Sequence, residues 1–176
     1  MGEEVKLDFS KKIKRDILNI LKTKQNANEF VEFIHFLSNE TFSTDKFDVF
    51  AAVTEKYGDK RPGWFDSLQK NLPKDLDIKY VRECLNGLEM VVDGAEIVKI
   101  EMPFVPSNSF INDLYKLLGQ SKTGGASKGK FLIDVEVNES LIGGAKIYVG
   151  GKYINLTLNQ MILSYLETND AIKRYL

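Results

Sequence analysis

The 176-residue sequence has few of the residues that build reactive centres. It contains one cysteine, Cys84, and one histidine, His35. One cysteine cannot close a disulfide within the chain, and with a single histidine it cannot supply the usual four ligands of a structural zinc ion. No serine stands in a recognisable nucleophile turn. We therefore expect no catalytic residue, no metal and no cofactor.

The sequence also lacks an excess of charge of either sign and lacks long apolar runs. Lysine and arginine number 24 against 25 aspartate and glutamate residues, so no overall positive field would attract nucleic acid. No segment reaches the ~18 consecutive apolar residues of a membrane helix. The first residues, Met-Gly-Glu-Glu, do not resemble a signal peptide. These absences predict an intracellular protein that neither binds nucleic acid nor spans a membrane.

One segment has part of a phosphate-loop pattern. Residues 124–130 read Gly-Gly-Ala-Ser-Lys-Gly-Lys. A phosphate loop leaves a strand and opens a helix, whereas this segment is predicted to leave a helix and enter a strand. Phe131 also stands where the magnesium-binding serine or threonine is required. A connecting loop is the favoured interpretation, and a nucleotide site is the alternative.

The first half of the chain has apolar side chains spaced three and four residues apart, which indicates amphipathic helices. We predict helices over residues 8–21, 28–37, 45–57 and 75–92, and a short helix at 64–68 that ends before Pro73. The wide apolar arc of 28–37 predicts a central place in a bundle. Beyond Asp93-Gly94 the apolar period falls to two, so residues 1–93 are predicted to form a helical domain.

Residues 94–176 are predicted to form a second, smaller domain. Strands are expected near 97–102, 131–137, 145–149 and 152–154, and helices over 110–118 and from Thr157 onward. The polar, glycine-rich segment 119–130 is expected to be a flexible loop. The order is thus β-α-β-β-β-α, and the whole chain is predicted to be α+β, with an N-terminal helical bundle followed by a C-terminal βαββ(β)α domain.

Two glycine pairs bracket one short strand of this domain. Gly143-Gly144 suits a bend that needs positive φ or has no room for a side chain, and Gly150-Gly151 is a favoured two-residue hairpin loop. The pattern predicts a bent hairpin that leads into the terminal helix.

This stretch resembles the C-terminal signature of the δ subunit of F-type ATP synthases, called the oligomycin-sensitivity-conferring protein in mitochondria. The residues in register with that signature are Leu141, Ile142, Gly143, Gly144, Val149, Gly150, Ile154 and Thr157. Asn155-Leu156 replaces the usual Asp-Gly, and Thr157 replaces a serine. The resemblance covers roughly the last half of the chain, while residues 1–92 match only in length and helical character and lack the family's early Ala/Tyr-rich motif.

The resemblance implies a non-catalytic stator subunit, part of the peripheral stalk of a rotary ATP synthase. In that family the N-terminal domain binds the N-terminal segments of α subunits, and the C-terminal domain holds the peripheral-stalk b subunits. By analogy, helices within 8–57 would bind α, and the last helix with strands 97–102 and 131–137 would bind the stalk. The expected interaction surface consists of Met161, Ile162, Tyr165, Leu166, Ile172 and Tyr175.

The same resemblance implies a peripheral subunit of a membrane complex, on the cytoplasmic face of the membrane. The lack of a basic, serine-rich leader favours a bacterial source over the mitochondrial matrix or chloroplast stroma. Two alternatives remain open. The E subunit of V-type or archaeal-type ATPases has a similar glycine pattern and an Asn-Thr before its final helix, and an unrelated two-domain interaction module would make the spacing a coincidence.

Overall fold

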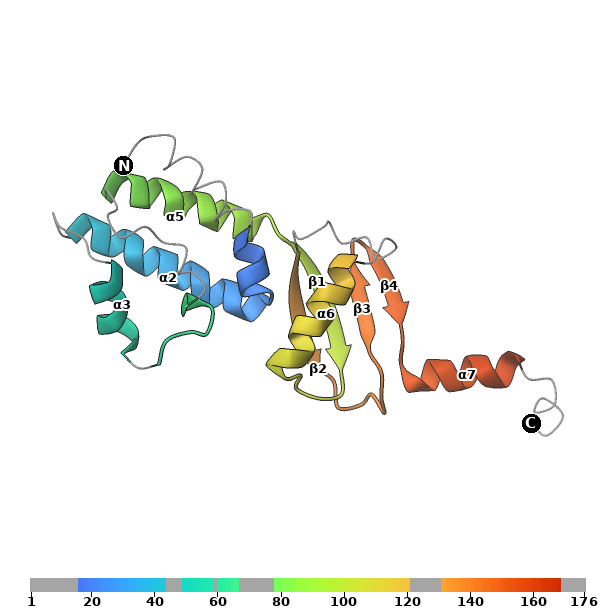
Figure 1. The fold of residues 1–176 in the computed structure, drawn as a ribbon. Helices are drawn as coiled ribbons and strands as arrows, with labels where there is room; N and C mark the ends of the chain where they lie inside the picture. The colour runs from blue at the N-terminus through green and yellow to red at the C-terminus, as the bar shows by residue number, and fades with distance from the viewer. Residues whose placement is uncertain (1–15, 44–48, 59, 67–77, 121–130, 169–176) are drawn as a thin grey trace. The chain divides into compact units, whose positions relative to one another are not determined.

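The computed structural model describes residues 16–43, 49–58, 60–66, 78–120 and 131–168 (Figure 1). The chain divides into two compact units, Met1–Ala95 and Glu96–Leu176, and each has its own architecture. The described part of the first unit is helical, and the second contains a four-stranded sheet. The predicted α+β fold class is confirmed.

The first unit is organised around its longest helix, α2 (Lys24–Ser43). It contacts α3 (Val49–Tyr57) and α5 (Ile78–Asp93), and residues 16–21 form a further helical segment. The central place predicted for this helix is confirmed, but it begins earlier and ends later than the predicted 28–37. Thr23 explains the early start, because its Oγ1 accepts a hydrogen bond from the backbone N–H of Asn26 at 3.2 Å.

The core of the first unit is an aromatic cluster on α2. Phe30 and Phe33 are fully buried and meet Trp64 edge-on, with ring centroids 5.3 and 5.4 Å away. Phe65 packs edge-on against Phe33 at 5.9 Å. Edge-to-face pairs at these separations add to the stabilisation that comes from burying the rings. The cluster holds the segment around Trp64 against the middle of α2.

His35 does not lie in this core. It is on the exposed side of α2, and its Nε2 lies 2.7 Å from Oε1 of Glu89 on α5. The contact joins α2 to α5 at the surface. His35 is exposed because the neighbouring Phe33, Ile34 and Leu37 take the buried side of α2.

The second unit follows the predicted order of strands and helices. It consists of β1 (Glu96–Met102), α6 (Asn108–Gln120), β2 (Phe131–Val137), β3 (Lys146–Val149), β4 (Lys152–Asn155) and α7 (Leu158–Thr168). The strand order in the sheet is β2-β1-β3-β4. β1 and β2 are parallel, with α6 as their crossover, and the other two pairs are antiparallel.

One face of this sheet is covered by α6 (Figure 1). The buried cluster beneath it comprises Val98, Ile100, Met102, Tyr115, Phe131, Ile133 and Val149. Tyr115 of α6 stacks on Phe131 of β2 with ring centroids 4.5 Å apart. The Oγ of Ser107 caps α6 by accepting from the N–H of Phe110 at 3.3 Å. The period-two apolar residues of β1 and β2 therefore face α6, as their spacing predicts.

The hairpin between β3 and β4 also has the predicted form. Gly150 and Gly151 adopt φ of 53° and 73°, the left-handed pair that a type I′ turn requires. The turn pairs Val149 with Lys152 and Tyr148 with Tyr153 across the ladder.

Some predictions concern residues outside the described ranges. These are the starts of the helices predicted at 8–21, 45–57 and 75–92, the end of the helix at 64–68, and residues 121–130 of the predicted loop with its phosphate-loop pattern. The first two residues of that predicted loop, Gly119 and Gln120, belong to α6. None of the helices in the described ranges has the length and hydropathy needed to cross a bilayer.

Candidate protein-interaction surface

The last helix of the second unit stands away from the sheet. Figure 1 shows α7 leaving the end of β4 and running clear of the strands, whereas α6 lies across them. Apolar side chains along β4 and α7 are exposed, and we call them the β4–α7 surface: Tyr153, Ile154, Leu156, Leu158, Met161, Ile162, Leu163 and Tyr165. Met161 and Tyr165 are 61% and 62% exposed. The helix thus has large apolar side chains that are mostly exposed.

The apolar side chains of α7 are not confined to one narrow stripe. At ~100° per residue, Leu158, Met161, Ile162, Leu163 and Tyr165 spread over an arc of about 200°. An ordinary surface helix has an apolar stripe of roughly 100° that faces its own core. An arc of this width is typical of a helix surrounded by other polypeptide on more than one side.

The surface also lacks charge. No charged residue occurs from Tyr153 to Leu166, in a chain of which 28% is charged. Interfacial membrane helices usually carry lysine or arginine on their polar face, and within this stretch α7 has none. The centres of protein interfaces are likewise depleted in charged residues. The composition therefore favours a protein partner over a membrane surface.

The structure brings two of the signature residues into direct contact. Gly144 has φ of 80°, and a Cβ built on it would lie 2.1 Å from the backbone oxygen of Leu156 and 2.9 Å from Cα of Thr157. Thr157 is buried, with 6% of its surface exposed. In the first glycine pair it is therefore Gly144 that has no room for a side chain. It lies where the chain before β3 crosses the chain after β4.

The remaining signature residues have separate places. Val149 and Gly150 belong to the hairpin, with Val149 in the core cluster. Ile154 is partly exposed on β4, and Leu141 and Ile142 precede the glycine pair, with Ile142 exposed. Gly143 has room for a Cβ, whose nearest neighbour would be Cβ of Leu158 at 3.7 Å.

The expected interaction residues on α7 are exposed where the structure describes them. Met161, Ile162 and Tyr165 all belong to the β4–α7 surface. The side chain of Leu166, and the residues Ile172 and Tyr175, lie outside the described part. Sequence reasoning missed Tyr153, Leu156 and Leu163, although the uncharged run from 153 to 166 is a signal that could have found them.

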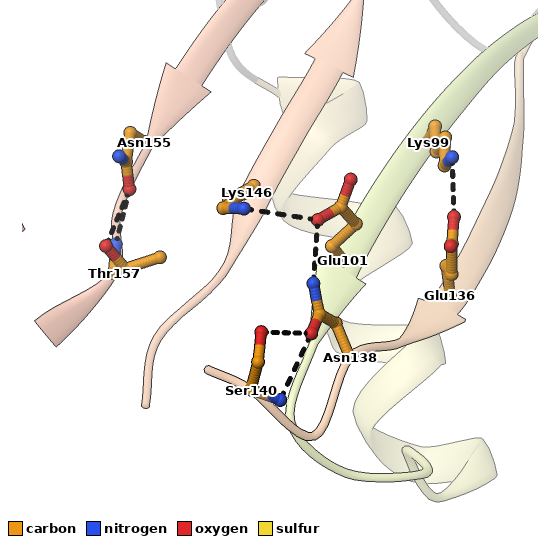
Figure 2. A network of polar contacts seen from close by, with 8 residues as sticks. All are labelled: Lys99, Glu101, Glu136, Asn138, Ser140, Lys146, Asn155 and Thr157. Atoms are coloured by element: carbon orange, nitrogen blue, oxygen red, sulfur yellow. Dashed lines mark hydrogen bonds and ion pairs between the residues drawn. The ribbon is translucent and has the colours of Figure 1, made fainter. Parts of the chain in front are cut away.

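The sheet face opposite α6 has a different character. Lys99 of β1 pairs with Glu136 of β2, and Lys146 of β3 lies 3.4 Å from Glu101 of β1 (Figure 2). Glu101 also accepts a hydrogen bond from Nδ2 of Asn138 at 3.3 Å. These charged side chains of β1, β2 and β3 are paired across neighbouring strands. Two of the strands, β1 and β2, are those expected to join the docking face, and they also carry the exposed apolar residues Ile97 and Val137. Their part in docking stays a prediction.

The network sets the charge state of Glu101. Partial desolvation raises the pKa of this carboxyl, but hydrogen bonds from Asn138 and Tyr148 and the charge of Lys146 outweigh it, so the pKa lies below its ordinary value. The hydrogen bond and charge of Glu136 raise the pKa of Lys99. Both groups thus stay ionised near neutral pH. A carboxyl held in this state is unsuited to general-acid catalysis.

Metal-ligating side chains do not gather within the described residues. No three histidine, cysteine, aspartate or glutamate side chains come together there in a ligand arrangement. The chain matches no protein-family model and no curated protein sequence. Among the described residues, the exposed apolar side chains of the β4–α7 surface make it the candidate site.

Proposed function

We propose that the protein is a non-catalytic stator subunit in the peripheral stalk of a rotary F-type ATP synthase. It would link the catalytic head to the membrane-anchored b subunits and resist rotation while proton flow drives ATP synthesis. The second unit would bind the b subunits through the β4–α7 surface. The helical first unit would bind the N-terminal segments of α subunits.

The observation that carries this proposal is the exposed apolar surface of α7, a helix that belongs to the region of signature resemblance. Burial of apolar area contributes ~25 cal/mol per Å², so exposed side chains such as Leu163 and Tyr165 can supply strong binding without charge. A helix that lies against partner helices can carry a load through such burial and still bend elastically. These are the physical requirements of a stator joint.

The E subunit of a V-type or archaeal-type ATPase is the alternative that a specific feature favours. Asn155 and Thr157 match its Asn-Thr, and they are hydrogen-bonded to each other here. Against this alternative, that family begins with a long uninterrupted stalk helix. The first unit instead contains separate helices α2, α3 and α5. The F-type assignment therefore has the better support.

Co-expression with the ATP synthase subunits of the same organism tests the proposal. The full chain, carrying an affinity tag, is expected to co-purify with α, β and b, and native mass spectrometry is expected to show it in a defined ratio to them. By the same proposal it lies on the cytoplasmic face of a bacterial membrane as a peripheral subunit. Recovery of the chain without α and b would refute the assignment.

A matched pair of charge substitutions locates the docking site. Met161→Glu places a carboxylate among the apolar side chains of α7, and it is expected to abolish capture of b while capture of α persists. Gln160→Glu adds the same charge to the other side of the helix, outside the apolar arc, and is expected to leave both intact. Equal loss of b in the two variants would show that the apolar arc is not the binding face.

A further inference from the structure

The junction between β4 and α7 is tied to the chain before β3 by backbone hydrogen bonds. The N–H of Leu156 donates to the carbonyl of Ala145 at 2.8 Å, which continues the β3–β4 ladder past the end of the strands. The N–H of Leu158, the first residue of α7, donates to the carbonyl of Gly143 at 3.0 Å. The first turn of the helix is thus anchored to the sheet.

Close backbone packing also holds the junction between β4 and α7 in place. Gly144 lies so near Leu156 and Thr157 that a side chain has no space, and its φ of 80° is one that residues with a Cβ rarely adopt. Two chain segments therefore meet here backbone to backbone, directly beneath the start of α7.

Side-chain hydrogen bonds stabilise the turn between β4 and α7. Oδ1 of Asn155 accepts from the N–H of Thr157 at 3.1 Å and from its hydroxyl at 2.7 Å (Figure 2). Oγ1 of Thr157 in turn accepts from the N–H of Gln160 at 3.4 Å, as a helix N-cap does. One hydroxyl thus joins the last residue of β4 to the first turn of α7.

We propose that Gly144, Asn155 and Thr157 form a bracket that sets the direction of α7 and presents it, already folded, to its partner. This inference rests on the proposed docking function of α7. A helix that contacts no other part of the sheet has its direction set at its first turn alone. Because the bracket orders that turn before binding, the partner need not supply the free energy to do so. Asn155 and Thr157 are thus positioning residues for docking.

Pulsed electron-spin distance measurements on the full chain test the bracket without any partner. Spin labels at Glu139→Cys and Glu167→Cys, in a Cys84→Ala background, report the position of α7 relative to the sheet. The unaltered bracket is expected to give one narrow distance distribution. Thr157→Val removes the hydroxyl with little change in volume and is expected to broaden the distribution, while Thr157→Ser is expected to keep it narrow.

The result that would overturn the bracket is a broad distribution before any substitution, or no broadening in Thr157→Val. If Thr157→Val fails to fold, Asn155→Ala removes the two hydrogen bonds that Asn155 accepts from Thr157 and is judged by the same criterion. A melting temperature that falls in Thr157→Val without broadening would assign Thr157 a purely structural role, and would also refute the proposal.

Binding of the b subunits then links the bracket to docking. Thr157→Val is expected to weaken their affinity by about fivefold, the equilibrium equivalent of one lost helix cap, and Thr157→Ser is expected to restore it. Unchanged affinity in Thr157→Val would remove the positioning role. A narrow distance distribution, together with no affinity for b in the unaltered chain or in either variant, would support the bracket and refute the stator assignment. The two failures are therefore distinguishable.

Discussion

Helices α6 and α7 belong to the same unit, have similar lengths and share an apolar three-and-four spacing. Only α6, however, packs against the sheet. α6 buries Ile111 and Tyr115 against the strands, and it leaves Leu117 exposed on its far side. α7 buries none of its described apolar side chains. The comparison teaches that amphipathic spacing predicts a helix but does not identify what the helix packs against.

The difference between the two helices comes from their connections. α6 is the crossover between parallel strands, and such a connection must return across the face of the sheet. α7 follows the edge strand β4, and no strand comes after it within the described residues. Its direction relative to the sheet is therefore set at the junction, and its apolar side chains are exposed.

The largest loss of stability is expected from a substitution in the core beneath α6. Phe131 is fully buried and stacks on Tyr115, so Phe131→Ala removes its contacts and leaves a cavity. It is expected to lower the free energy of unfolding of the second unit by about 3–5 kcal/mol. Urea unfolding followed by circular dichroism measures this loss. Tyr165→Ala on α7 is the control, and a comparable loss there would show that α7 is packed after all.

The next largest loss of stability is expected at the first glycine pair, Gly143-Gly144. Gly144→Ala forces a Cβ toward the backbone oxygen of Leu156 at a positive φ, and is expected to cost about 2 kcal/mol or more. Gly143→Ala is the matched control, because its Cβ would make only ordinary contacts and its φ is not positive. Thermal unfolding of both variants measures the difference. Equal melting temperatures would contradict the close crossing of the two segments.

A smaller, pH-dependent effect is expected from Tyr115 on α6. Burial raises the pKa of this phenol to about 12 from an ordinary value of 10.0. Because the folded state holds the proton more tightly, the stability that Tyr115 contributes is complete below pH 10 and is lost as the pH rises toward 12.

The measurement for Tyr115 is the free energy of unfolding from pH 9 to 12. Tyr115→Phe cannot lose this proton, so its stability is expected to fall less steeply than that of the unaltered chain. Parallel curves for Tyr115→Phe and the unaltered chain would show that Tyr115 ionises as freely as an exposed tyrosine.

Local spacing was enough to predict the elements and their order. The alternation of Val98, Ile100 and Met102 identified β1, and Gly150-Gly151 identified the hairpin. Helix ends were less predictable, since α2 begins where Thr23 caps it and not where its apolar arc becomes wide. The parallel pairing of β1 with β2 depends on contacts between distant segments, which no local pattern records.

Only part of the candidate site could be predicted, because local spacing does not record contacts between distant segments. Helical spacing identified Met161, Ile162 and Tyr165 as one apolar side, but it could not show that this side is uncovered. The role of Asn155 also could not be read from the sequence, because its hydrogen bonds to Thr157 depend on the turn geometry at the end of β4. Exposure and crossing geometry are properties of the folded chain.

The smallest effect on stability is expected on α7, from a substitution that has a matched partner on α6. Ile162→Ala removes an exposed side chain and is expected to change the free energy of unfolding by less than about 0.5 kcal/mol, whereas Ile111→Ala, on the buried side of α6, is expected to cost about 2–4 kcal/mol. Chemical denaturation of the isolated chain measures both. If a partner covers α7, the ranking changes in its presence: Ile162→Ala then weakens the complex, because the stabilisation of Ile162 comes only from the partner. A large loss for Ile162→Ala in the isolated chain would mean that α7 already packs against its own domain and is not free to dock.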